Sequence, residues 1–113
     1  MAEMRRRWRT ENRLRVNAIN ASRRAMKRGA SGRGIGAEDL TLMTAAALGL
    51  CTYCGEHGRL TLDHIEPLFL GGAHDFDNVT LACAACNCSK GDTVLLVWLA
   101  KRAALFRERE YGR

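Results

Sequence analysis

Apolar side chains follow a helical spacing in the first half of the chain and a strand-like spacing in the second half. Over residues 10–28, thin apolar stripes recur among arginines, which predicts a helix that packs on one side only. Thr10 or Asn12 is expected to cap its start. Glycines recur through residues 29–36, a composition typical of a linker. A second helix is predicted over residues 37–49, because acidic side chains occupy its first turn and apolar ones follow at helical spacing.

The pattern changes after a first pair of cysteines. Residues 59–65 are typical of a strand, and residues 78–82 predict a second, shorter one. Between them, residues 67–77 are expected to form a loop around a Gly-Gly pair. A helical segment is predicted near the second pair of cysteines, and Asp92 is expected to cap a last helix over residues 93–111. The predicted fold class is α+β, in one small domain with an appended arm.

Charge is distributed unevenly along the 113 residues, whose net charge is +6. Residues 1–33 hold eleven Arg or Lys against two Glu, a balance of +9, whereas residues 34–91 hold two basic and seven acidic residues. This asymmetry favours a protein that holds a polyanion with one part and handles a cation with another. The basic residues expected to contact nucleic acid are Arg5, Arg6, Arg7, Arg9, Arg23, Arg24, Lys27 and Arg28. Such contacts would be salt-dependent and largely blind to base sequence.

Hydropathy also limits where the protein is expected to act. The sequence has no apolar run long enough to span a membrane, and no apolar segment follows its basic start as in a signal peptide. We therefore expect a cytoplasmic protein. In that compartment disulfides are rare, and paired cysteines usually bind a metal.

Two C-x2-C pairs predict a zinc site. Cys51 and Cys54 form the first pair, and Cys83 and Cys86 form the second. Together they offer four thiolates, which would close the tetrahedral coordination of zinc and make the ion structural. Coincidental reduced core cysteines and redox chemistry remain open as alternatives, although redox chemistry needs only one pair. Cys88 is expected to be a spare buried thiol.

Between the cysteine pairs, Asp63 and His64 stand side by side in the predicted strand. An aspartate is a hard oxygen donor suited to Mg²⁺ or Mn²⁺, and a histidine can take a proton from water near neutral pH. On a regular strand, neighbouring side chains point to opposite faces. Both would reach one site only where the end of the strand twists.

At these residues the chain resembles the HNH endonuclease family. The shared pattern is C-x2-C, then DHI-x-P-x-x-x-GG, then Asn, then C-x2-C-N-x-x-K-G, over residues 51–91. The resemblance implies a ββα-metal (His-Me finger) core and metal-dependent hydrolysis of DNA that leaves 3′-hydroxyl and 5′-phosphate ends. The small size also resembles stand-alone phage proteins of this family. This suggests DNA processing near genome packaging in a bacterial or phage-infected cell, with packaging proteins as candidate partners.

The same resemblance implies roles for four residues. Asp63 would bind the catalytic divalent ion, Asn87 would be its second protein ligand, and His64 would be the general base. Asn78 would bridge the loop and hold the His64 ring by a backbone contact. From the residues alone, a helix cap remains open for Asn87 and a turn residue for Asn78.

Other side chains receive weaker assignments. His74, in the Gly-Gly loop, is expected to touch the scissile phosphate or help to bind metal, with a solvated loop residue as the alternative. Lys90 shares a helix face with Asn87 and is expected near a phosphate. Trp8 and Trp98 are expected to pack rather than to stack on bases.

The predicted division is a basic arm with its linker (residues 1–36) and a nuclease domain (residues 37–113), whose ββα-metal core spans residues 51–91 and whose C-terminal helix spans residues 92–111. Two other functions remain open. A noncatalytic zinc-ribbon module that binds nucleic acid would explain the cysteines and the arm but leaves Asp63 and its neighbours without a purpose. An interaction protein would use the arm and the last helix to bind a partner.

Overall fold

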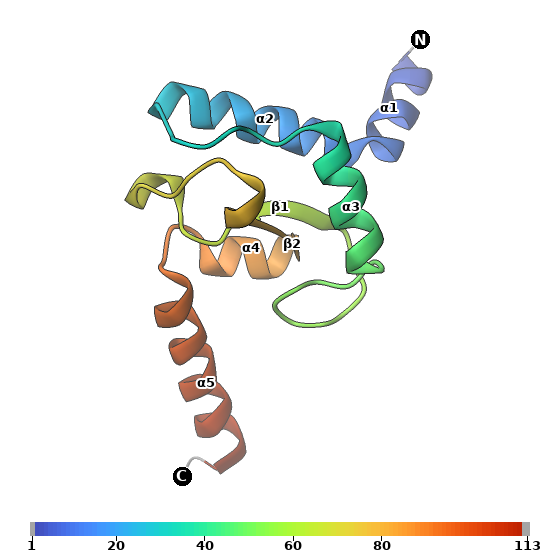
Figure 1. Cartoon of the computed structure of the whole chain (residues 1–113). Helices are drawn as coiled ribbons and strands as arrows, with labels where there is room; N and C mark the ends of the chain where they lie inside the picture. Colours follow the sequence, from blue (N-terminus) through green and yellow to red (C-terminus); the bar gives the residue numbers. More distant parts are fainter. Residues whose placement is uncertain (1, 112–113) are drawn as a thin grey trace.

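A computed structural model describes residues 2–111 of the chain, except the side chains of residues 9–11, 110 and 111. A two-stranded sheet lies between helices, and a long C-terminal helix extends away from it (Figure 1). The elements are α1 (Ala2–Glu11), α2 (Arg13–Arg28), α3 (Ala37–Ala47), β1 (Leu60–His64), β2 (Val79–Cys83), α4 (Ala84–Lys90) and α5 (Leu95–Tyr111), with single 3₁₀ turns at Leu68–Leu70 and Phe76–Asn78.

The sheet separates two small cores. β1 and β2 are antiparallel, with Leu62 opposite Leu81 and His64 opposite Val79. Leu62, Val79 and Leu81 pack against α2 and α3 on one face of the sheet. On the other face, α4 and the start of α5 cover a second cluster that includes two of the cysteines (Figure 1). The predicted α+β fold class is confirmed, and both strands lie within about one residue of their expected bounds.

α2 packs on the sheet through its alanines. Ala18, Ala21 and Ala25 are all buried, and their small side chains let the helix axis come close to β1. The arginines of α2 lie on its remaining faces, so the expectation of one-sided packing is correct. The division at residue 36 stays a prediction, but Ala18 and Ala21 belong to the same core as the strands.

The N-terminal segment holds two helices where the sequence predicts one. α1 ends at Glu11, and α2 begins at Arg13. The side-chain amide of Asn12 donates to the carbonyl of Trp8 at 2.8 Å and makes no capping bond to α2. Asn12 is therefore the N-cap residue of α2, as expected, but without a side-chain capping bond, and the alternative cap Thr10 lies outside the described side chains.

The glycine-rich residues 29–36 pack against the body of the protein. The His74 N–H donates to the Ser31 carbonyl at 2.7 Å, and the Gly34 N–H donates to the His74 carbonyl at 2.9 Å. A Cβ on Gly32 would lie 2.4 Å from that carbonyl oxygen, at a φ of +110° that favours glycine. Residues 29–36 connect α2 to α3, and their glycines allow them to pack on the protein because two backbones can touch there.

α5 joins the second core only at its start. Trp98 is buried, and its ring meets that of Tyr53 edge-on with 5.1 Å between the ring centres. Its Nε1–H donates to Ser89 Oγ at 3.0 Å. Trp98 therefore packs, as expected. Further along, Leu105 and Phe106 are exposed, and the helix starts at Leu95 rather than at the expected residue 93. No helix in the described range 2–111 has the length and apolar character needed to cross a bilayer.

Candidate active site and zinc knuckle

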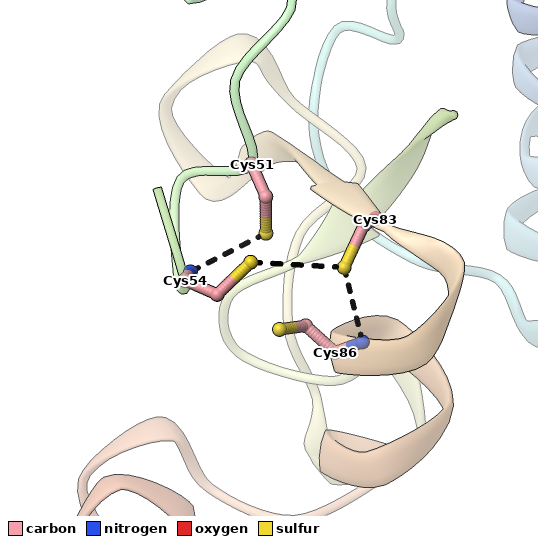
Figure 2. A group of neighbouring side chains, drawn as sticks. All are labelled: Cys51, Cys54, Cys83 and Cys86. Carbon is pink, nitrogen blue, oxygen red and sulfur yellow. Dashed lines mark hydrogen bonds between the residues drawn. The ribbon is translucent and has the colours of Figure 1, made fainter. Parts of the chain in front are cut away.

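The four cysteines of the two C-x2-C pairs come together at one end of the sheet. Figure 2 shows the sulfurs of Cys51, Cys54, Cys83 and Cys86 facing a common centre. All four Sγ atoms lie within 4.8 Å of one another, and those of Cys54 and Cys83 are 3.9 Å apart. Zinc–sulfur bonds of about 2.3 Å in a tetrahedron place sulfurs roughly 3.8 Å apart. This cluster therefore fits a zinc ion.

Backbone amides support the sulfurs. The N–H groups of Tyr53 and Cys54 approach Cys51 Sγ at 3.3 and 3.5 Å, and the Cys86 N–H approaches Cys83 Sγ at 3.4 Å. Burial opposes ionisation of Cys51, but the surrounding amides outweigh it and lower the pKa of this thiol to about 6. The amides therefore favour the thiolate at Cys51, whereas burial and the neighbouring thiols raise the pKa of Cys86 to about 12. We name residues 51–54 and 83–86 the zinc knuckle.

A polar cavity of about 270 Å³ lies at the end of β1. It is bounded by α2 on one side, by the 3₁₀ turn after β1 on another, and by α4. Its polar lining comes from Asn17, Arg24 and Arg28 of α2, from Asp63 and His64 of β1, and from Asn87 and Asp92. Three of the four residues to which the sequence assigns roles in one site thus line a single cavity.

Asp63 and His64 point to opposite faces of β1, as the alternation of a strand requires. His64 lies on the face that packs against α2, and Asp63 lies on the face of α4. Asp63 is buried, its Oδ2 accepts a hydrogen bond from the Tyr53 hydroxyl at 2.5 Å, and the same oxygen pairs with Lys90 Nζ at 3.3 Å. Tyr53 lies between Cys51 and Cys54, so it links Asp63 to the zinc knuckle.

Two asparagines hold the outer edge of β1. The Leu62 N–H donates to Asn17 Oδ1 at 2.7 Å. Asn87 donates from Nδ2 to Thr61 Oγ1 at 2.8 Å and to the Leu62 carbonyl at 3.3 Å. The amide nitrogen of Asn87 is thus committed to β1, which leaves its oxygen as the group able to bind a cation. Asn17 is not among the residues predicted from the sequence; its signal is that Ala21, Arg24 and Arg28 follow at i+4, i+7 and i+11 on one helix face.

His64 contacts a second histidine. Its Nε2 lies 2.9 Å from His74 Nδ1, so Nδ1 is the nitrogen of His64 that remains for the cavity. Burial, followed by electrostatic repulsion from His74, Arg24 and Lys90, lowers the pKa of His64 to about 4. The ring is therefore neutral near pH 7 and able to accept a proton.

Asn78 ties the loop between the strands. Its Oδ1 accepts from the Glu66 N–H at 2.9 Å, and its Nδ2 donates to the carbonyls of Glu66 and Ala73 at 2.9 and 2.8 Å. Its own carbonyl accepts from the Ile65 N–H at 2.9 Å, one residue after His64. Gly72 is required here, because a Cβ would lie 1.9 Å from the Glu66 carbonyl. The side chain of Asn78 therefore bridges the loop, and its expected backbone contact to the His64 ring stays a prediction.

Three side chains differ from their expected positions. His74 and Lys90 are buried, with only 5% and 1% of their surface exposed, because each has internal partners. The ammonium of Lys90 lies against Asp63 and also donates to the His64 carbonyl at 2.9 Å, so neither side chain lies at the surface where a phosphate was expected. Cys88, in contrast, is exposed rather than buried.

The basic residues of the N-terminal segment divide into two groups. Arg24 and Arg28 line the cavity near one end of α2, whereas Arg23 and Lys27 are exposed outside its lining. Arg5, Arg6 and Arg7 belong to α1, which joins the opposite end of α2 (Figure 1). The side chain of Arg9 lies outside the described part of the chain. These residues therefore do not form one continuous basic surface around the cavity.

Comparison with known proteins gives a family match for the central part of the chain. No curated protein matches the chain. The two-stranded antiparallel sheet, the helix after it and the cysteine cluster are consistent with a ββα-metal fold. Residues 51–93, which contain both strands, α4 and all four clustered cysteines, match the model of the HNH endonuclease family.

Proposed function

We propose that the protein is a metal-dependent endonuclease that hydrolyses DNA phosphodiester bonds. The observation that supports this most directly is the shared cavity: a neutral imidazole, an aspartate and an asparagine surround it, with two arginines at its rim. A base, oxygen ligands and cationic groups are the components that phosphodiester hydrolysis requires.

Each residue has a distinct role in this proposal. His64 takes a proton from the attacking water at Nδ1, because its Nε2 faces His74. Asp63 and Asn87 supply oxygen ligands for Mg²⁺ or Mn²⁺, and Asn78 keeps the loop closed behind His64. A divalent ion supplies stabilisation of the negative charge on the phosphate and the leaving 3′ oxygen when it is bound.

The ligands fit a weakly held ion. The hydrogen bond from Tyr53 and the ion pair with Lys90 both end on Asp63 Oδ2, so Oδ1 is the oxygen left for a cation. Among the described residues, groups of three or more His, Cys, Asp or Glu ligands occur at the zinc knuckle alone. An ion at Asp63 and Asn87 would therefore need water and phosphate oxygens as further ligands, which is the habit of Mg²⁺. We propose that the ion at the knuckle is structural, since four thiolates leave no open position.

Arg24 and Arg28 are the residues proposed to hold the phosphates on either side of the scissile bond. Both line the cavity, and the Arg28 guanidinium lies 5.6 Å from the centre of the Phe69 ring, which orients it. Because α2 carries these residues, the proposed nuclease unit at residues 37–113 would lack part of its substrate site without the preceding segment. A cytoplasmic location and a role in phage DNA packaging remain predictions.

Replacing Arg24 and Arg28 together by alanine is expected to weaken binding of duplex DNA and to reduce the slope of log K against log salt by about 2, roughly one unit for each lost phosphate contact. The matched control replaces Arg23 and Lys27 by alanine, which removes the same charge from the same helix outside the cavity. The measurement is a binding titration at several salt concentrations. Equal losses in both variants would contradict a specific role for the cavity arginines.

The proposed function is tested by incubating the zinc-loaded protein with supercoiled, linear and single-stranded DNA. Nicked or linear plasmid should appear with Mg²⁺ or Mn²⁺ and should not appear with a chelator that removes the divalent ion but leaves the zinc. DNA binding without cleavage in the presence of either ion would instead support a noncatalytic zinc module.

A further inference from the structure

Three side chains from separate parts of the chain form a hydrogen-bonded row that ends at the proposed base. Ser22 Oγ lies 2.9 Å from His74 Nε2, and His74 Nδ1 lies 2.9 Å from His64 Nε2. We propose that Ser22 and His74 are positioning residues that keep the proton of neutral His64 on Nε2 and so leave the Nδ1 lone pair open to the cavity. The inference rests on the proposed nuclease function. It extends the active centre to the N-terminal helix, outside the segment that matches the family.

The row can carry its protons in two directions. In the first, His64 Nε2–H donates to His74 Nδ1, and His74 Nε2–H donates to Ser22 Oγ. In the second, the Ser22 hydroxyl donates to His74 Nε2, and His74 Nδ1–H donates to His64 Nε2. A neutral imidazole carries one N–H, so the second direction puts the His64 proton on Nδ1. Only the first direction leaves His64 able to take a proton from water at the cavity.

The first direction also suits the charged state that follows. After His64 has taken a proton at Nδ1, its ring is an imidazolium whose two nitrogens both donate. His74 Nδ1 is then already an acceptor for the Nε2–H, so the row needs no rearrangement during proton transfer. Both directions of the row are those of two neutral rings, each of which carries a single N–H.

The surroundings of His74 are built to fix its ring. The side chain is 5% exposed, and its backbone N–H and carbonyl are both bound by residues 31–34. Gly32 approaches the His74 carbonyl too closely for any Cβ. On the other side, Ser22 lies on α2 between Ala18 and Ala25, which are buried. A ring held on its backbone and on both nitrogens is a means of orienting His64 rather than of contacting substrate.

Two substitutions of His74 distinguish a role in orienting the His64 ring from a role in filling space in the core. His74→Asn keeps an oxygen near the position of Nδ1 that can accept from His64, whereas His74→Leu has similar volume and no acceptor. We expect kcat for plasmid cleavage to fall about 10–100-fold in His74→Leu, to recover largely in His74→Asn, and KM to change by less than about 3-fold in both. The kcat of Ser22→Ala should lie between those of the two His74 variants, and Ser22→Thr should keep the wild-type kcat.

The proton position can be measured without any cleavage. The chain has three histidines, so ¹⁵N-labelled histidine in the zinc-loaded protein gives a simple two-bond ¹⁵N–¹H spectrum. We expect His64 to be protonated at Nε2 in the wild type and to become a mixture of tautomers in His74→Leu. His57→Leu is the matched control, because His57 is exposed and lies outside the row. It should change neither the spectrum of His64 nor kcat.

A wild-type spectrum with the His64 proton on Nδ1 would overturn the inference, as would wild-type kcat in a folded His74→Leu protein. If His74→Leu fails to fold, the wild-type spectrum and the Ser22→Ala and Ser22→Thr pair decide the question. If the wild-type protein cleaves no DNA, the proposed function fails, but the spectrum still shows whether His74 sets the tautomer of His64.

Discussion

Replacing His64 by alanine is expected to reduce divalent-dependent plasmid cleavage at neutral pH by about 10²–10⁴-fold, the usual contribution of a general base. The reason is positional: among the described residues that line the cavity, His64 is the one with an imidazole, and its Nδ1 is the nitrogen not turned toward His74. The measurement is the rate of nicking of supercoiled DNA with Mg²⁺ or Mn²⁺. Near-wild-type nicking by this variant would end the proposed mechanism.

The variant must remain folded for that result to count. The His64 side chain is partly exposed at the cavity, and its removal leaves His74 Nδ1 without its partner, which costs roughly 1–3 kcal/mol. Zinc content and the thermal unfolding midpoint should therefore be measured beside the activity. His57→Ala is the matched control, since it removes an exposed imidazole from the knuckle side of the protein. It should leave cleavage unchanged.

Local sequence patterns predict the framework of the site well. The spacing of the cysteines predicts that four thiols meet, and the alternation along β1 predicts that Asp63 and His64 point to opposite faces. Both features depend on short-range geometry, two residues between sulfurs and a period of two along a strand. The structure adds that both side chains nevertheless line one cavity, which lies at the end of the strand.

The partners of the site could not be predicted in the same way, because they depend on contacts between distant segments. Ser22 and His74 are 52 positions apart, and nothing in the apolar stripe of α2 indicates that a serine beside it meets a histidine. Lys90 looks like a surface cation until Asp63 and the His64 carbonyl are placed beside it. Buried polar residues are exceptions to the usual pattern, and their partners appear only in three dimensions.

The packing of the glycine-rich segment could not be predicted for a related reason. Residues 29–36 have the composition of a flexible linker, yet they pair with the backbone of His74 and Asp75. Glycine favours both flexibility and close approach of two backbones, and composition cannot separate these uses. Gly32 shows which use applies here, because the Cβ of any other residue would collide with the His74 carbonyl.

Replacing Cys83 by serine is expected to abolish zinc binding and to unfold the region around the knuckle. Zinc contributes about 10–16 kcal/mol to the folding of zinc-finger peptides, which equals or exceeds the total stability of about 5–15 kcal/mol typical of a domain. The core at the knuckle is small and includes two of the cysteines themselves, Cys51 and Cys86, so little apolar burial would compensate. Zinc stoichiometry and the loss of cooperative thermal unfolding are the measurements.

Cys83 is the most informative cysteine to change, because it also caps α4. Its Sγ accepts from the Cys86 N–H at 3.4 Å, and serine is itself a good cap, so a loss of stability in Cys83→Ser reports the missing zinc ligand. Cys88→Ser is the matched control, since that thiol is exposed and outside the cluster. A Cys83→Ser protein that unfolds cooperatively at the wild-type temperature would show that the sheet holds without the ion. In that case the zinc would not be needed for stability. It would instead affect cleavage, because Tyr53 connects the knuckle to Asp63 in the cavity.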